Sequence, residues 1–158
     1  MPRCHRLATL LLAISALSAA SLCAQPANPL VGTWTVEYEM GRRVEDGQVT
    51  SITGTGTLKV EASGDSLVGL LQAPLRPDGS VVPVATLGGR AAKGTAVLNQ
   101  KASATMNMNG EITTIEVTVT WTLQASGDTL TGTLLRALPP GIPAAAEPSP
   151  VTGTRVKG

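Results

Sequence analysis

Apolar and polar residues alternate along most of this chain, which is the pattern of half-buried β-strands. The clearest example runs from 112 to 136 and consists of two alternating segments around Gly127-Asp128. Glycine accepts the positive φ that a two-residue hairpin turn demands, so this turn sets the strand register. In that register Trp121 faces Leu134 on an apolar side of the sheet, and threonines occupy the other side. The turn and the alternation therefore predict the same buried face.

The same construction occurs twice, because the tract A-S-G-D-[S/T]-L-x-G-x-L is present at 62–71 and again at 125–134. In both hairpins a glycine lies opposite a large inward residue, which leaves room for the sheet to curl. A third turn, Asn109-Gly110, is the strongest short hairpin signal in the chain. It chooses the same face of the strand after it as the Gly127 turn does. All three turns therefore predict the same face of the sheet as the barrel interior.

Continued along the chain, the pattern predicts eight strands and no helix longer than a turn. We expect them at about Leu30–Met40, Val49–Ala62, Ser66–Ala73, Val81–Ala92, Thr95–Met108, Ile112–Ser126, Thr129–Arg136 and Val151–Lys157. A charged connection spans 41–47, and 138–150 is a Pro/Ala-rich loop.

Eight sequential strands are the number at which an antiparallel up-and-down (meander) barrel closes, its interior either filled or holding one small ligand. The fold class predicted is therefore all-β, with residues 30–158 as a single barrel domain. Closure would pair the last strand with the first and remove both sheet edges, so we expect a monomer.

The first 24 residues have the composition of a secretory signal peptide. Arg3 and Arg6 precede an apolar run from 7 to about 20, and a cut is expected between Ala24 and Gln25. The run is shorter than the roughly 20 apolar residues of a comfortable membrane span. We therefore expect a periplasmic or secreted protein that does not span a membrane after signal removal, with 25–29 as a short linker.

Removal of that segment changes the available chemistry. Cys4, Cys23 and His5 all lie within it, so the remainder has no thiol and no imidazole. The usual bases, the thiol nucleophile and the nitrogen and sulfur metal ligands are then missing, and we expect no enzyme, no metal and no cofactor. Of 12 basic residues two are removed, which leaves ten against eleven acidic residues, a net charge of −1 that argues against nucleic acid as a partner.

Three glutamates, at positions 37, 39 and 116, fall on the polar faces of their strands. We expect all three to point outward into solvent, with Glu116 diagonal to Lys101.

Two short motifs at the ends of the predicted barrel carry a family resemblance: Gly32-Thr33-Trp34 and Gly153-Thr154-Arg155. They resemble the calycin group of lipocalins, avidins and fatty-acid-binding proteins. This resemblance implies a lipocalin-like barrel closed at one end by Gly32, Trp34 and Arg155, with Arg155 stacked on the Trp34 ring. The chain is also similar to small bacterial secreted proteins of uncharacterised function that are built from G-D-x-L-x-G hairpins.

The predicted interior is rich in Val, Leu, Ala and Gly and contains few aromatic or polar residues. Candidate ligand-binding residues in it are Tyr38, Leu98, Gln100, Met106 and Trp121. The small side chains could leave a narrow apolar cavity, or they could let the barrel flatten and fill itself.

Two functions follow. The first is a non-enzymatic exported barrel that binds a small hydrophobic ligand in its interior. The alternative is an envelope or extracellular protein-interaction or structural module with a filled core, which would use the 138–150 loop or the Thr-rich outer face. The sequence does not identify a protein partner.

Overall fold

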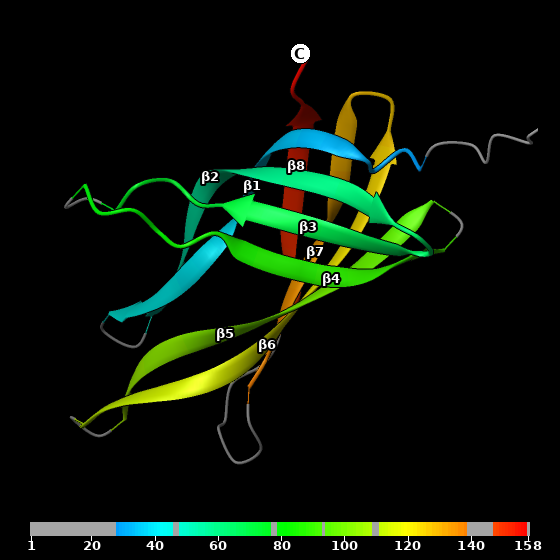
Figure 1. The fold of residues 1–158 in the computed structure, drawn as a ribbon. Coiled ribbons are helices and arrows are strands. Elements are labelled where there is room, and N and C mark those ends of the chain that lie inside the picture. The colour runs from blue at the N-terminus through cyan, green and yellow to red at the C-terminus, as the bar shows by residue number, and fades with distance from the viewer. Residues whose placement is uncertain are drawn as a thin grey trace, which may run out of the picture.

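The chain folds as one antiparallel sheet closed into a barrel, in a computed structural model that describes residues 28–45, 48–76, 79–92, 94–108, 111–138 and 147–157 (Figure 1). The strands are β1 (Gly32–Glu45), β2 (Gln48–Ser63), β3 (Ser66–Gln72), β4 (Ala85–Ala92), β5 (Thr95–Met108), β6 (Glu111–Ser126), β7 (Thr129–Ala137) and β8 (Ser149–Arg155). Each strand pairs with its neighbours in sequence, and β8 pairs with β1. The predicted eight-stranded meander barrel is confirmed. Within the described ranges, no helix has the length and apolarity needed to cross a bilayer.

The strand register predicted from the turns is also confirmed. Trp121 lies opposite Leu134 on β7 and opposite Leu98 on β5. The turn glycines Gly64 and Gly127 both have a φ of 59°, in the left-handed region that the hairpin requires. One face of the sheet is buried around the whole barrel in this register, and the third predicted turn, Asn109-Gly110, lies outside the described residues. The fully buried side chains on that face include Trp34, Trp121, Leu58, Leu87, Leu98, Leu123, Leu130 and Leu134.

The glycines that face large residues allow strands to approach one another closely. A Cβ at Gly132 would lie 2.1 Å from the carbonyl oxygen of Thr122, and one at Gly89 would lie 1.9 Å from that of Val97. No side chain fits at such distances from a neighbouring backbone. These two positions are therefore glycine because the sheet curls tightly there.

Two hairpins extend past the barrel wall. β1 pairs with β8 only over 34–37, and β2 pairs with β3 only from 57 onward. Residues 38–45 and 48–56 therefore form a two-stranded extension, the first ribbon. In the same way, 100–108 of β5 and 111–117 of β6 pair only with each other and form the second ribbon. Both extend from the same end of the barrel, toward the lower left in Figure 1.

We call this the ribbon end, and the opposite end, which holds residues 28–31 and the Gly64 and Gly127 turns, the plugged end. The first ribbon corrects one sequence-based expectation. The charged tract 41–47 was expected to be a connection, but β1 continues to Glu45 and β2 begins at Gln48.

Two other strand boundaries differ from the prediction. β4 begins at Ala85 rather than near Val81, since Pro83 cannot donate to a ladder. β8 begins at Ser149 and includes Pro150, which pairs with Thr133 of β7, whereas the ladder to β1 starts only at Thr152.

A β-bulge in β1 brings Arg42 onto the same face as Glu39. The β1–β2 register shifts between Glu39 and Gly41, so Met40 is an extra residue with no partner of its own on β2. One inserted residue changes the face of the side chains that follow it, so Arg42, paired with Ser51, lies on the face of Glu39 and Thr53. Glu39 pairs with Thr53 on the outer face, as expected, but it is only 4% exposed instead of solvated, and Met40 is 42% exposed. Glu37 and Glu116 are exposed as expected, and Glu116 forms an ion pair with Lys101 at 3.0 Å.

Candidate functional site

The plugged end of the barrel is sealed by its own residues. The indole Nε1 of Trp34 donates to the carbonyl oxygen of Leu30 at 2.8 Å, and both side chains are fully buried. The guanidinium of Arg155 lies 4.1 Å from the centroid of the Trp34 ring and donates to the carbonyls of Val31 at 2.9 Å and Pro29 at 2.6 Å. The stacking that the family resemblance implied is therefore present, and it closes this end.

Gly32 makes that closure possible. Its φ is 138°, and a Cβ there would lie 2.5 Å from Nη1 of Arg155. A side chain at this position would push the guanidinium away from β1. The three residues Gly32, Trp34 and Arg155 thus form one packed unit.

The interior toward the ribbon end is arranged differently. The rings of Tyr38 and Trp121 meet there with centroids 5.1 Å apart and planes inclined at 57°. Both are buried, at 6% and 1% exposure. The indole Nε1 of Trp121 is also buried and has no hydrogen-bond acceptor among the described residues. This donor is the one buried side-chain nitrogen or oxygen in the described structure that has no partner.

Polar side chains continue the same interior toward the ribbon end. Gln100, Val119 and Arg136 lie directly opposite one another on β5, β6 and β7, so they form one row across the inner face. Gln100 and Arg136 are half-buried. The row below it contains Leu98 and Trp121, where Leu98 is fully buried against the core.

Four of the five predicted ligand-binding residues thus lie in one half of the barrel: Tyr38, Leu98, Gln100 and Trp121. The side chain of the fifth, Met106, lies outside the described structure, although its backbone pairs with Thr113 in the second ribbon.

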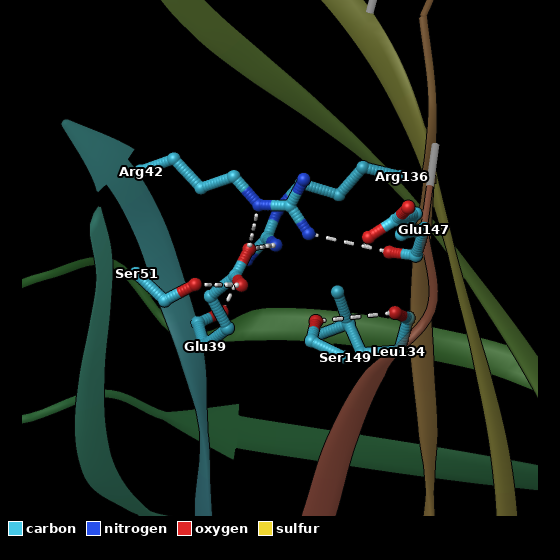
Figure 2. Close-up of polar contacts among 7 residues, drawn as sticks. All are labelled: Glu39, Arg42, Ser51, Leu134, Arg136, Glu147 and Ser149. Carbon is cyan, nitrogen blue, oxygen red and sulfur yellow. Dashed lines mark hydrogen bonds and ion pairs between the residues drawn. The ribbon is translucent and has the colours of Figure 1, made fainter. Parts of the chain in front are cut away.

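A charged cluster lies at the ribbon end, and Figure 2 shows its polar contacts. Oε1 of Glu39 accepts from Nη1 of Arg136 at 2.8 Å and from Nε of Arg42 at 3.1 Å. Oε2 accepts from the hydroxyl of Ser51 at 2.8 Å, and Arg136 also donates to the backbone carbonyl of Glu39. Arg42 reaches further, to the carbonyl of Glu147 at 3.3 Å. Both carboxylate oxygens are therefore satisfied.

The position of this cluster follows from the prolines of the last strand. The β1–β8 ladder ends at the pair Glu37–Thr152, and Pro148 and Pro150, which precede Thr152, have no N–H to donate. Past that point Arg136 of β7 reaches over the start of β8 to Glu39 of β1. Side chains thus hold the barrel seam where backbone hydrogen bonds cannot.

The surroundings change the acidity of three of these groups. Burial alone would raise the pKa of Glu39, but hydrogen bonds from Ser51 and Arg42 and the charges of Arg42 and Arg136 outweigh it, and the pKa is lowered. Burial lowers the pKa of Arg136, with the Glu39 carboxylate opposing this shift. Burial also raises the pKa of Tyr38, which keeps its phenol neutral.

This arrangement is suited to binding through hydrogen bonds. The Trp121 N–H is an unused donor, the Gln100 amide can donate and accept, and the Arg136 charge is already engaged by Glu39. Within the described ranges there is no group of three or more His, Cys, Asp or Glu residues that could hold a metal ion.

The outer wall carries a separate shallow groove of about 150 Å³ over β5, β6 and β7. Its polar lining consists of Thr95, Thr122, Gln124, Thr131 and Thr133. No charged or aromatic side chain lines it, and it lies on the opposite face of the sheet from Trp121.

Sequence reasoning missed Glu39 and Arg136. For Arg136 a signal existed, because the alternation that places Leu130 and Leu134 inside also points Arg136 inward. For Glu39 the alternation gave the correct face but not its burial under Arg42 and Arg136, and only Gly41, a residue that tolerates irregular backbone, hinted at the bulge that brings Arg42 to that face.

Comparison of the chain with protein-family models, with curated proteins and with solved structures found no match.

Proposed function

We propose that this chain is a non-enzymatic, exported barrel that binds a small, uncharged and mainly apolar molecule in the interior next to the ribbon end. The bound molecule would carry one hydrogen-bond acceptor, such as a ketone, ester or hydroxyl oxygen. Tyr38, Leu98 and Trp121 would contact its apolar body, and Gln100 would lie on the side that faces the ribbon end.

The observation that carries this proposal is the unpaired indole N–H of Trp121. Leaving a buried donor unsatisfied costs about 1–3 kcal/mol, so native structures nearly always pair such groups. In this barrel the other indole, that of Trp34, has its acceptor at 2.8 Å. A ligand oxygen beside Trp121 would remove the penalty, and the same interior would accept the ligand's apolar part.

Charge supports an uncharged ligand over an ionised one. The nearest cation, Arg136, already makes two hydrogen bonds to Glu39, one to its carboxylate and one to its backbone carbonyl. A ligand carboxylate would have to compete with Glu39 for it or remain buried against neutral donors alone. Burial of an ionised carboxylate without a charged partner is strongly unfavourable.

Exposure indicates the direction of access. The lining of the plugged half is fully buried, whereas Gln100, Ala102 and Ala104, which continue β5 toward the ribbon end, are half-buried. The inner face of the sheet is therefore more exposed toward the ribbon end, and we propose that a ligand arrives from that side.

Three ten-carbon probes test the proposal: 2-decanone, which has a neutral acceptor, decane, which has none, and decanoate, which is charged. We expect 2-decanone to bind about tenfold more tightly than decane, the value of one hydrogen bond to an otherwise unpaired donor. Tryptophan emission and native mass spectrometry would measure the binding.

The matched variants are Trp121→Phe and Trp34→Phe. The first should abolish the preference for 2-decanone over decane, and the second should retain it in the folded protein. Failure of all three probes to bind would contradict the proposal, and tighter binding of decanoate would refute the uncharged ligand class.

A second function, a protein-interaction module, is favoured by a different observation. Several large apolar side chains at the ribbon end are well exposed: Met40, Ile52, Leu75, Val81, Val84 and Ile112. Chemical cross-linking in the cell envelope, compared between the wild type and a variant with Leu75, Val81 and Val84 changed to Ser, tests it. Unchanged cross-links would argue against this surface.

A further inference from the structure

The two ribbons leave four strand edges without partners. Over 48–56, β2 is hydrogen-bonded through its backbone to β1 alone, and no backbone hydrogen bond joins it to any other described segment. The same holds for 38–45 of β1 and for both strands of the second ribbon. Unpaired edges are templates for strand addition, and proteins commonly protect them with charges or prolines.

The β2 edge differs from the other three in having no such protection. The segment 48–56, QVTSITGTG, has no charged residue and no proline, and it is rich in the β-branched residues that favour strands. The β1 edge contains Glu39, Arg42 and Arg43, the β5 edge contains Lys101, and the β6 edge contains Glu111 and Glu116. The β2 edge is therefore the one that can accept another strand at no electrostatic cost.

Exposed apolar side chains lie along this same edge. Ile52 is 45% exposed and Met40 is 42% exposed. A Cβ at Gly54 would lie 2.1 Å from Sδ of Met40, so Met40 lies across the face of β2 at Gly54. The neighbouring polar residue, Ser51, already has its hydroxyl bonded to Glu39. The edge thus offers free backbone groups beside a small uncovered apolar surface.

We propose that the β2 edge, residues 48–56, pairs antiparallel with the same segment of a second copy of this chain, about a two-fold axis near Ile52. A two-fold axis brings the same segment into the interface twice, so a charged edge would place like charges from the two copies near each other. The uncharged β2 edge avoids this, whereas the β1, β5 and β6 edges do not.

Such pairing would place Ile52 against its counterpart, with Met40 of each copy on the neighbouring Gly54. A single added ladder buries less area than the roughly 1,200 Å² of a standard stable interface, so the dimer should form reversibly and depend on concentration. The monomer expected from the sequence assumed that closure removes every edge. Barrel closure pairs the strand edges only within the barrel wall, and the edges of the two ribbons beyond it stay unpaired. This inference is independent of ligand binding at Trp121.

Sedimentation equilibrium of the purified protein, over about 1 µM to 1 mM, tests the proposal, with the state of residues 1–24 checked to be identical in all samples. We expect the average molecular mass to rise with concentration, from that of one chain toward that of two. Ile52→Lys should raise the dissociation constant at least about tenfold, because it sets two cations face to face. Ile112→Lys is the matched control, the same change at an exposed residue of the second ribbon, and should behave as wild type.

Amide hydrogen exchange identifies the edge directly. Protection of the amides in 49–56 should increase with concentration, and that in 101–107 should not. A wild type that stays a single chain throughout, a dimer that Ile52→Lys leaves intact, or a dimer that Ile112→Lys weakens equally would each overturn the proposal. Circular dichroism of both variants shows whether the barrel remains folded.

Discussion

The two tryptophans of this barrel are buried alike, but only one of them has a hydrogen-bond acceptor for its indole N–H. Trp34 at the plugged end and Trp121 toward the ribbon end are both inward, both on β-strands and both almost fully buried. Trp34 has an acceptor for its N–H and a guanidinium on its ring, whereas Trp121 has a tilted contact with Tyr38 and no acceptor. Burial alone therefore does not distinguish these two residues. The pairing of polar atoms does.

The arginines of the two ends show the same contrast. Arg155 at the plugged end donates to backbone carbonyls of the N-terminal segment and seals it. Arg136 at the ribbon end instead bonds a carboxylate on a strand with which its own strand does not pair. One end is closed by backbone and stacking, and the other is held by an ion pair across a seam.

The largest effect on stability is expected at the seam that Glu39 and Arg136 bridge. Glu39→Gln should lower the free energy of unfolding by about 3 kcal/mol, because it leaves the partly buried charge of Arg136 without its partner. Chemical denaturation measures it. Glu37→Gln, an exposed position two residues earlier on the same strand, is the control and should change stability little. Equal effects from both variants would mean that the cluster does not hold the ribbon end.

The next effect is expected at the plugged end. Trp34→Phe should cost about 2 kcal/mol, since it leaves the buried carbonyl of Leu30 unpaired and opens a small void. Arg155 also loses the larger indole face beneath it. Thermal and denaturant unfolding would measure the loss. A neutral outcome would show that the indole hydrogen bond is not part of the closure.

Acid should weaken the ribbon end in particular. The pKa of Glu39 is lowered from its ordinary value of 4.5, so its contribution to stability is fully present above that value and is lost as the pH falls through the lowered folded pKa. The difference in stability between wild type and Glu39→Gln should therefore shrink below that range. Unfolding measured across the acid range tests this. A constant difference between the two proteins would contradict it.

The smallest effect is expected at Trp121. Trp121→Phe removes an unpaired buried donor as well as some apolar area, and these changes oppose each other. We expect a change of less than about 1 kcal/mol in the absence of ligand, smaller than that of Trp34→Phe. A larger loss would indicate that the Trp121 N–H is paired after all, for example by an ordered water.

Much of the fold could be predicted from the sequence because its determinants are local. The two-residue turns at Gly64 and Gly127 fix which residues face each other, and the alternation fixes which side is inside. Together they placed Tyr38, Leu98, Gln100 and Trp121 on the inner face. The candidate site was less predictable, since Arg42 reaches the face of Glu39 only through a bulge, and Glu39 meets Arg136 97 residues away in sequence.

The sequence by itself determined the number of strands, their order, their register and the apolar face, because a period of two and tight turns act between near neighbours. Tertiary structure alone decided how far the hairpins extend past the wall, where β8 fails to pair with β1, and which buried indole lacks an acceptor. Those features depend on how distant strands end relative to one another around a closed barrel, and no local pattern of residues specifies that.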